Sequence, residues 1–343
     1  MDQQSIKDIA ASLVGGGKGL LAIDESMPTC NLRFKEVGIP QTFKLRLAYR
    51  DLIIETPGLA ASLNGFILSD EMIRQVAPDG TPLIRLITDA GLIAGIKVDR
   101  GAKPLAGFTD EKITEGLDGL RARLGDYLRL GARFAKWRAV FRIGEGIPSR
   151  ECIEANAHTL ARFASLSQEA GLVPVVEPEV LPQGNHSLQR CHEVTRNVLR
   201  AVFNHLNEQR VVLESMVLKC NMVTPGRNYA GKVTDTEISD ATVRCLLQSV
   251  PAVVPGIAFL SGGQPAVAAT RRLNDMNLRY KASVPWALTF SFGRAIQQPA
   301  LKLWAGQPQG ILPAQNALRL RAACNREAAR GAYQAFMESA NER

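Results

Sequence analysis

Short apolar segments recur along the whole chain, and their spacing constrains the fold more than any other feature. Each one ends in a charged or small polar residue, and roughly 30 to 42 residues separate one segment from the next, enough for a strand, a loop and a helix. The segments span residues 19–24, 62–68, 93–98, 133–138, 172–177, 213–219, 257–261 and 287–291. We predict that all eight are β-strands, because parallel strands are covered on both faces and form continuous apolar runs.

The intervals between these segments carry helix signals. Residues 151–170 are amphipathic and are followed by Gly171, a residue that commonly ends a helix. Thr234 and Glu237 have the spacing of a capping box ahead of the apolar residues 241–247. Eight strand–helix units predict an α/β fold of the (β/α)₈ TIM-barrel type, a parallel eight-stranded barrel with outer helices. An open doubly wound sheet is the weaker alternative, because the chain has no dinucleotide-binding fingerprint.

The chain shows no sharp linker along its 343 residues. We therefore expect residues 1–343 to form a single TIM-barrel domain, since barrels of about 250 residues or more fold as one unit. The final part, about residues 317–343, is rich in Ala, Arg and Glu and predicts a C-terminal helix with a short tail.

Composition narrows the possible partners. The net charge is +8, but the basic residues are scattered and aromatic residues make up only 6%, which argues against nucleic-acid binding and favours small anionic ligands. The chain has no apolar stretch of about 18 residues and no secretory leader, so we expect no membrane partner and a cytoplasmic location. Six cysteines without a C-x-x-C pair indicate reduced thiols, and four histidines without a ligand motif predict neither a metal nor a cofactor.

Active sites of barrels lie at the carboxyl ends of the strands, so the polar residues there are the candidates. Because strand residues alternate between faces, residues two apart share a face. The candidates are Asp24, Asn64, the pairs Lys97/Asp99, Lys136/Arg138, Glu177/Glu179 and Lys219/Asn221, and the serines Ser261 and Ser291. A mouth lined by lysines, an arginine and acids predicts a catalytic site.

Lys219 is the most informative of these residues, because it directly follows the apolar run 216–218. We expect burial and a neighbouring cation such as Lys136 to disfavour its ammonium form, which is how a Schiff-base lysine is activated. The alternative is a lysine that extends outward from a strand end into solvent.

Two acids are candidates for proton transfer. Glu177 ends the fifth segment, where a carboxyl group could serve imine formation, and its alternative role is an ion pair with Lys136 or Lys219. Asp24 ends the first segment and could take a proton from a substrate hydroxyl. Its alternative role is the N-cap of the next helix.

Glycine-containing turns follow the last two segments. Ser261, Gly262 and Gly263 follow the seventh, whereas Ser291, Gly293 and Arg294 follow the eighth. Barrels often bind phosphate with these two loops, so we predict a phosphate site, although two ordinary turns remain the alternative. The glycine-rich residues 15–19 lack the phosphate-loop pattern and predict only a turn into the first strand.

Seven motifs, in order and with matching spacing, closely resemble the class I fructose-bisphosphate aldolase family over roughly residues 5–335. They are LLAIDES at 20–26, GIKVD at 95–99, FAKWR at 134–138, VEPE at 176–179, NMVTPG at 221–226, FLSGGQ at 259–264 and WALTFSFGR at 286–294. The resemblance implies a metal-independent barrel enzyme, commonly a homotetramer, that splits fructose 1,6-bisphosphate into dihydroxyacetone phosphate and glyceraldehyde 3-phosphate.

The resemblance also implies a role for each matching residue. Lys219 would form the imine with the C2 ketone, Glu177 would shuttle protons with Glu179 on the same face, Asp24 would help to deprotonate the C4 hydroxyl, and Lys136 would stabilise charge. The residues implied to hold the 1-phosphate are Ser261, Gly262, Gly263, Ser291, Gly293 and Arg294. Those implied to lie towards the 6-phosphate or to contact the substrate elsewhere are Ser26, Thr29, Lys97, Arg33 and Arg138.

The chain departs from the family pattern at three places. Cys220 replaces the proline that usually follows the Schiff-base lysine, and Leu32 replaces a basic residue before Arg33. The eukaryotic members end in a tyrosine, whereas the last tyrosine here is Tyr333. Two other functions stay open from the sequence: a different imine-forming sugar-phosphate aldolase, and a catalytically inactive barrel that serves as a binding or scaffold protein.

Overall fold

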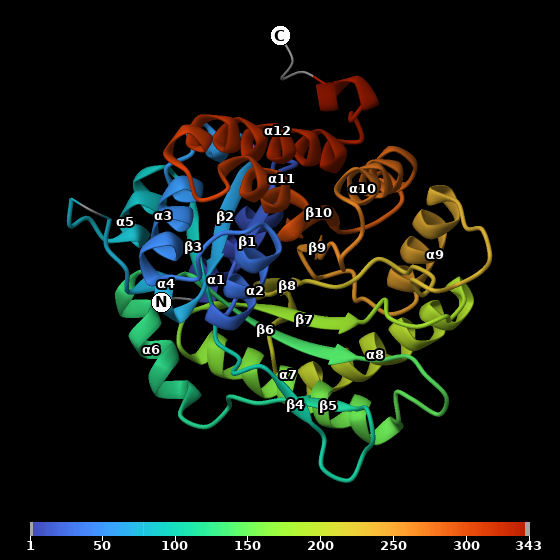
Figure 1. The fold of residues 1–343 in the computed structure, drawn as a ribbon. Coiled ribbons are helices and arrows are strands. Elements are labelled where there is room, and N and C mark those ends of the chain that lie inside the picture. Colours follow the sequence, from blue (N-terminus) through green and yellow to red (C-terminus); the bar gives the residue numbers. More distant parts are fainter. Residues whose placement is uncertain (1–2, 78, 340–343) are drawn as a thin grey trace.

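The computed structural model describes residues 3–77 and 79–339, and it confirms the closed parallel barrel (Figure 1). Around the barrel the strands follow the order β1-β10-β9-β8-β7-β6-β3-β2. They are β1 (Gly19–Ile23), β2 (Leu63–Leu68), β3 (Ile93–Lys97), β6 (Phe134–Phe141), β7 (Val173–Val180), β8 (Val217–Leu218), β9 (Gly256–Phe259) and β10 (Ala287–Phe292). Sequential neighbours therefore pair around the whole ring, as expected for right-handed βαβ units.

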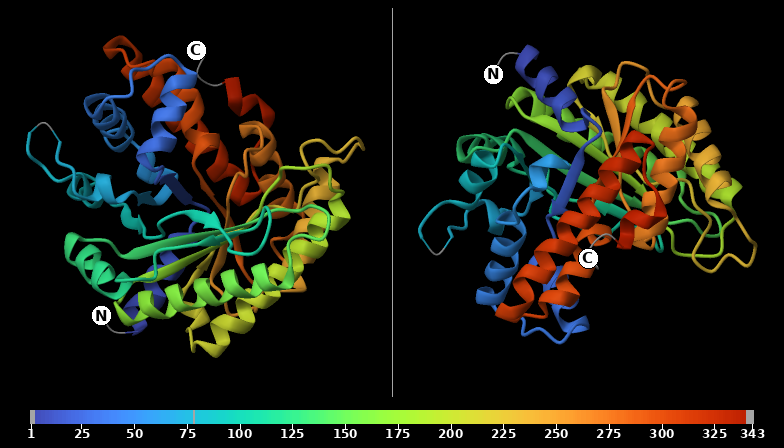
Figure 2. Two further views of the ribbon diagram at one scale, coloured as in Figure 1. Left: turned by 60° about the horizontal axis from the view of Figure 1, so that its bottom comes forward. Right: turned by 90° about the horizontal axis from the view of Figure 1, so that it is seen from above.

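Helices surround the barrel, and the first and last of them, α1 and α12, lie on different sides of it (Figure 2). The α-helices are α1 (Gln3–Val14), α2 (Met27–Glu36), α3 (Phe43–Ile54), α4 (Asp70–Ile73), α5 (Leu83–Asp89), α6 (Leu120–Leu130), α7 (Arg150–Glu169), α8 (Leu188–Glu208), α9 (Asp235–Leu247), α10 (Ala266–Tyr280), α11 (Arg294–Trp304) and α12 (Ile311–Arg330). Short 3₁₀ turns span Leu59–Ala61, Leu213–Ser215, Pro308–Gly310 and Ala335–Ser339, and a hairpin joins β4 (Ala102–Pro104) to β5 (Lys112–Thr114). No described helix is long and apolar enough to span a bilayer.

Local signals placed several of these elements correctly. Thr234 and Glu237 form the predicted capping box of α9. Gly171 has φ of +82° directly after α7, a left-handed conformation that glycine adopts without strain. The predicted C-terminal helix with a short tail, about residues 317–343, corresponds to α12, which begins earlier than predicted, at Ile311, and ends at Arg330. Residues 340–343 of that prediction lie outside the described part of the chain.

Three expectations about the strands need correction. The sixth segment is a 3₁₀ turn over Leu213–Ser215 followed by a strand of only two residues. The fourth and fifth strands continue to Phe141 and Val180, beyond the predicted ends. Asn64 lies near the start of β2, where its amide donates to the carbonyl oxygens of Leu13 and Gly15, so it belongs to the opposite end of the barrel from the predicted site.

The inside of the barrel changes character along its axis. At the amino ends of the strands, inward-facing side chains such as Leu20, Phe134 and Val217 pack against α1 through Leu13 and Val14. Further along the same strands, the inward positions become Lys136 on β6 and Glu177 on β7, while Lys219 directly follows β8. Helix α1 thus closes an apolar floor, and the polar groups face the other end.

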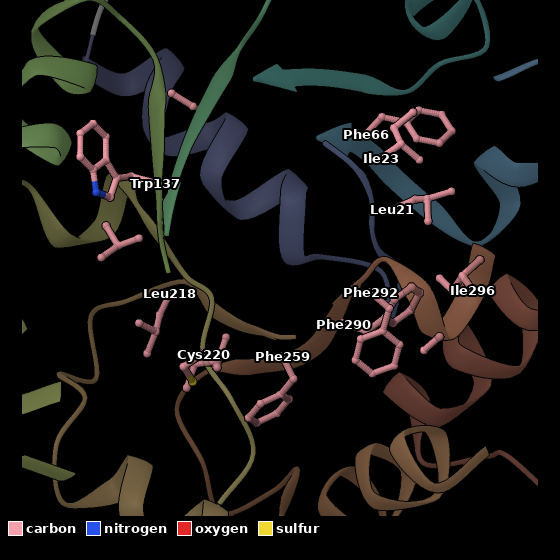
Figure 3. Close-up of a cluster of buried hydrophobic side chains, with 14 of the residues drawn as sticks. Leu21, Ile23, Phe66, Trp137, Leu218, Cys220, Phe259, Phe290, Phe292 and Ile296 are labelled. Atoms are coloured by element: carbon pink, nitrogen blue, oxygen red, sulfur yellow. The ribbon is translucent and has the colours of Figure 1, made fainter. Parts of the chain in front are cut away.

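The outward faces of the strands pack against the surrounding helices in a second, larger core (Figure 3). Leu21, Trp137, Leu218 and Phe259 alternate with the inward-facing residues of their strands and are fully buried here. Burial of apolar surface stabilises the fold by about 25 cal/mol per Å² removed from water. Because both cores are also closely packed, the barrel is a rigid support for the polar end.

Candidate active site

A cleft of about 600 Å³ opens at the carboxyl ends of the strands. Asn64 and Asn221, which were predicted from strand position alone, do not line it, whereas every residue with a predicted catalytic or phosphate-binding role does. These residues are Asp24, Ser26, Thr29, Arg33, Lys97, Lys136, Arg138, Glu177, Glu179, Lys219, Ser261, Gly262, Gly263, Ser291, Gly293 and Arg294. They come from seven of the eight strand ends, so only the closed barrel brings them together.

Two lysines and two acids form a buried network at the centre of the cleft. Lys219 Nζ lies 3.1 Å from Glu177 Oε1. Lys136 Nζ lies 3.0 Å from Glu177 Oε2 and 2.6 Å from Asp24 Oδ2. The two carboxylates are therefore joined through Lys136, and Glu177 contacts both lysines.

The strands themselves set this geometry. In the parallel ladder Lys136 pairs with Val175 on one side and with Lys97 on the other, which fixes the height of its side chain in the barrel. Lys219 N donates to Val176 O at 2.9 Å, so the ladder continues through the lysine although β8 has ended. The predicted alternation of faces placed these side chains correctly.

Burial opposes ionisation in this network, but opposite charges outweigh it. Burial acts to raise the pKa of Asp24, yet the ammonium groups of Lys136 and Lys219 lower it to about 2. The pKa of Glu177 is also lowered, because Lys136, Lys219 and Arg138 outweigh the effect of burial. The pKa of Lys136 is raised, since the attraction of Asp24 and Glu177 exceeds the cost of burying its charge. Asp24, Glu177 and Lys136 are thus charged at neutral pH.

The structure decides between the alternatives for these residues. Lys219 is only 3% exposed, so it does not extend into solvent. Glu177 does form the ion pairs considered for it, with both lysines at once. Asp24 is not a helix cap, because the N-cap of α2 is Ser26.

One end of the cleft has the features of a phosphate site. Gly262 and Gly263 have φ of +56° and +74° in a tight turn that Gln264 N closes onto Ser261 O, a left-handed backbone that favours glycine. Ser291 Oγ is buried, and the described residues offer it no hydrogen-bond partner. Gly293 is the N-cap of α11, whose first-turn N–H groups suit an anion.

At the other end, hydroxyl groups and paired cations line the cleft. Ser26 Oγ and Thr29 Oγ1 lie 3.0 Å apart at the start of α2. Lys97 Nζ lies 2.6 Å from Asp99 Oδ1. Arg33 pairs with Glu25, just as Arg138 pairs with Glu179 on the neighbouring strand.

The structure shows the surroundings of the residues at which the chain departs from the family pattern. Cys220 is buried, and its carbonyl oxygen accepts from Leu260 N at 3.0 Å, so backbone hydrogen bonds hold Lys219 from both sides without a proline. Leu32 lines the cleft and is 58% exposed. Tyr333 is not among the cleft residues, and its hydroxyl donates to Glu338 Oε1 at 2.9 Å.

Two residues that support the cleft, Gln297 and Glu25, cannot be identified as such from the sequence. Gln297 on α11 is fully buried, donates to Ala22 O at 2.6 Å and to Glu25 Oε1 at 3.0 Å, and accepts from Tyr49. Glu25 lies in the motif at residues 20–26, but nothing in the sequence marks it as a partner of Gln297. No local pattern marks a glutamine that acts across 272 residues. Over the described ranges, His, Cys, Asp and Glu form no group of three or more that could hold a metal ion.

Fold and site together define a (β/α)₈-barrel enzyme with a lysine-rich catalytic cleft. A family model described as "Fructose-bisphosphate aldolase class-I" matches residues 5–343. The chain belongs to this family, whose members are lyases.

Similar proteins agree with this assignment. The chain is 51% identical over 334 residues to "Probable fructose-bisphosphate aldolase class 1" of Xanthomonas campestris, which covers 97% of this chain and 99% of that protein. It is 47% identical to "Fructose-bisphosphate aldolase" of Drosophila melanogaster, over 96% of this chain and 91% of that one. A crystal structure of the Plasmodium falciparum aldolase, in complex with TRAP and a small-molecule inhibitor, matches with a TM-score of 0.94 and 42% identity over 96% and 95% of the two chains.

Proposed function

We propose that this chain cleaves fructose 1,6-bisphosphate reversibly through an imine on Lys219, within glycolysis and gluconeogenesis. The observation that carries the proposal is the buried amine of Lys219, 3.1 Å from a carboxylate that also contacts Lys136. A deprotonated amine is the nucleophile required, and a carboxylate at that distance can take and return its proton.

The reaction starts at the C2 ketone of the substrate. Glu177 takes a proton from the ammonium group of Lys219, and the neutral amine adds to this carbon to give a carbinolamine. Glu177 then returns the proton to the carbinolamine hydroxyl, which leaves as water and yields the iminium ion. Lys136 keeps a positive charge beside both acids, so negative charge that develops in the cleft is stabilised.

The bond between C3 and C4 then breaks. Asp24, ionised and close to Lys136, takes the proton of the C4 hydroxyl, and glyceraldehyde 3-phosphate leaves as its carbonyl forms. The bonding electrons move into the iminium ion, which becomes an enamine. Protonation at C3 and hydrolysis of the imine release dihydroxyacetone phosphate and restore Lys219. The iminium ion is the electron sink, so this route needs no metal or organic cofactor.

Both phosphates have groups to receive them. The 1-phosphate binds at Ser261, Gly262, Gly263, Ser291, Gly293 and Arg294. Ser26, Thr29 and Lys97 lie towards the 6-phosphate, and Arg33, Arg138 and Glu179 complete the walls of the cleft. The unpartnered hydroxyl of Ser291 supports the first assignment.

We infer that the enzyme works in a reducing compartment and forms a homo-oligomer. All six cysteines are free thiols and all are buried, which suits a reducing compartment and hence the cytoplasm. A homo-oligomer, by family resemblance a tetramer, is proposed as the assembly.

Borohydride trapping tests the mechanism. The protein is incubated with dihydroxyacetone phosphate and EDTA, reduced with borohydride, and analysed by peptide mass spectrometry. We expect an irreversible adduct on Lys219, and the variant Lys219→Met should give none. A folded wild-type protein without the adduct would refute the imine and favour an inactive, ligand-binding barrel.

A further inference from the structure

A second guanidinium group, that of Arg227, lies beside the proposed 1-phosphate site. Arg227 is an exposed residue of the segment between β8 and α9. Its Nη2 donates to Gly262 O at 3.5 Å. A Cβ atom built on Gly263 would collide with this Nη2 and would lie 3.1 Å from Nη2 of Arg294. Both arginines therefore contact the same glycine of the turn.

The backbone fixes the place of Arg227, although its side chain is exposed. Arg227 N donates to Pro182 O at 2.8 Å, and Gly226 N donates to His186 O at 2.8 Å. A side chain at position 226 would collide with the carbonyl oxygen of Gly184, so the segments around Gly184 and Gly226 touch backbone to backbone. This contact holds the arginine against the turn after β9.

The charges around this turn are unbalanced. Arg33, Lys97, Lys136 and Arg138 each form an ion pair with a carboxylate. Among the described residues, no carboxylate pairs with Arg227 or Arg294. Two like charges held against one glycine repel each other, and a dianion bound between them would remove this cost.

We propose that Arg227 is a second guanidinium ligand of the phosphate bound at the Gly262–Gly263 turn and sets the affinity for dihydroxyacetone phosphate. The inference rests on the proposed function, since that function places the 1-phosphate here. Arg294 and Arg227 then hold the phosphate from two sides, and Ser291 contributes a hydroxyl. The competing role for Arg227 is purely structural, as a donor that supports the turn through Gly262 O.

The test compares Arg227→Ala and Arg227→Lys with a matched control, Arg85→Ala. Arg85 is an exposed arginine of α5 outside the cleft, so its loss makes the same change in net charge. Isothermal titration measures the Kd of dihydroxyacetone phosphate and of inorganic phosphate. Steady-state condensation measures the KM of glyceraldehyde 3-phosphate, which occupies the other end of the cleft.

We expect both Kd values to rise about tenfold in Arg227→Ala, because a hydrogen bond to a charged group is worth about 1.5 kcal/mol or more. The Kd values of Arg227→Lys should lie between those of the wild type and of Arg227→Ala, since lysine keeps the charge but cannot form a bidentate pair with the phosphate. The KM of glyceraldehyde 3-phosphate should stay within about twofold, and Arg85→Ala should leave all three constants unchanged.

The proposal is overturned if Arg227→Ala binds both phosphates as tightly as Arg85→Ala does. It is also overturned if the thermal midpoint falls and the constants at both ends of the cleft worsen together, which would indicate a structural role. These outcomes differ from failure of the proposed function, where the wild-type protein forms no Lys219 adduct. In that case the Kd of inorganic phosphate still decides whether Arg227 binds the anion.

Discussion

At the scale of single residues, neighbouring lysines keep Asp24 and Glu177 ionised, because they lower the pKa of both carboxyl groups. Asp24 has only 12% of its side chain exposed and lies 2.6 Å from the ammonium group of Lys136. A carboxylate so deeply buried would be costly without this partner. The contact that keeps Asp24 ionised therefore also links the stability of the fold to pH.

The pKa of Asp24 falls from 3.8 to about 2 on folding, so its contribution is present above pH 3.8 and is lost as the pH falls through 2. The full contribution is about 2.5 kcal/mol, of which about 1 kcal/mol is lost by pH 3. We predict that Asp24→Asn is less stable than the wild type at pH 6, and that the gap narrows by about 1 kcal/mol at pH 3. Urea unfolding at both pH values measures it, and a constant gap would contradict the assignment.

At the scale of elements, Gln297 ties α11 to β1 and α2. Its amide donates to Ala22 O, two residues before Asp24, and to Glu25, while its carbonyl oxygen accepts from Arg33 and Tyr49. Because α11 begins beside the Ser291–Gly293 end of the cleft, and α2 carries Thr29 and has Ser26 as its N-cap at the other end, the glutamine connects the two ends of the cleft.

Replacing Gln297 with Met keeps its length but leaves several buried polar groups without partners. We predict a loss of about 2 kcal/mol in the free energy of unfolding, together with a raised KM for fructose 1,6-bisphosphate, because Arg33 loses its support. Urea denaturation and steady-state kinetics measure the two effects. The control Gln189→Met, in a glutamine that bonds Glu193 on the exposed face of α8, should change stability by less than about 0.5 kcal/mol. Equal stability of the two variants would argue against the link.

Elements differ in how far the sequence predicts them. The strands that carry Lys136 and Glu177 were predictable, because continuous apolar runs end in polar residues and period 2 sets the shared face. The strand before Lys219 was overestimated, since an apolar run does not distinguish a two-residue strand from the 3₁₀ turn that precedes it. The hairpin of β4 and β5 escaped prediction, because strands of three residues carry no periodic signal.

The residues of the site also differ in how far the sequence predicts them. Lys219 directly follows an apolar run and Arg294 ends the motif at 286–294, so the sequence locates both residues. Arg227 and Gln297 act through contacts that are distant along the chain or lie outside any motif, so only the folded structure reveals them. Asn64 was misplaced, because its position within the apolar segment did not show that it faces the amino end of the barrel.

At the scale of the whole molecule, the barrel divides stability from function along its axis. The floor is apolar and closed by α1, where Leu13 is fully buried against strand residues. At the mouth, the hydroxyl of Ser291 is buried and has no hydrogen-bond partner among the described residues. Substitutions at the two ends should therefore have opposite signatures.

We predict that Leu13→Ala lowers the free energy of unfolding by about 3 kcal/mol, because it leaves a cavity, while kcat and KM stay within about twofold.

Ser291→Ala should leave stability unchanged or raise it by up to about 1 kcal/mol, because it removes a buried hydroxyl that has no partner among the described residues. The same variant should raise the KM of fructose 1,6-bisphosphate about tenfold. Urea unfolding and steady-state cleavage assays on the same preparations test both. If Ser291→Ala destabilised the protein and left KM unchanged, the hydroxyl would serve the fold, and the division between floor and mouth would not hold.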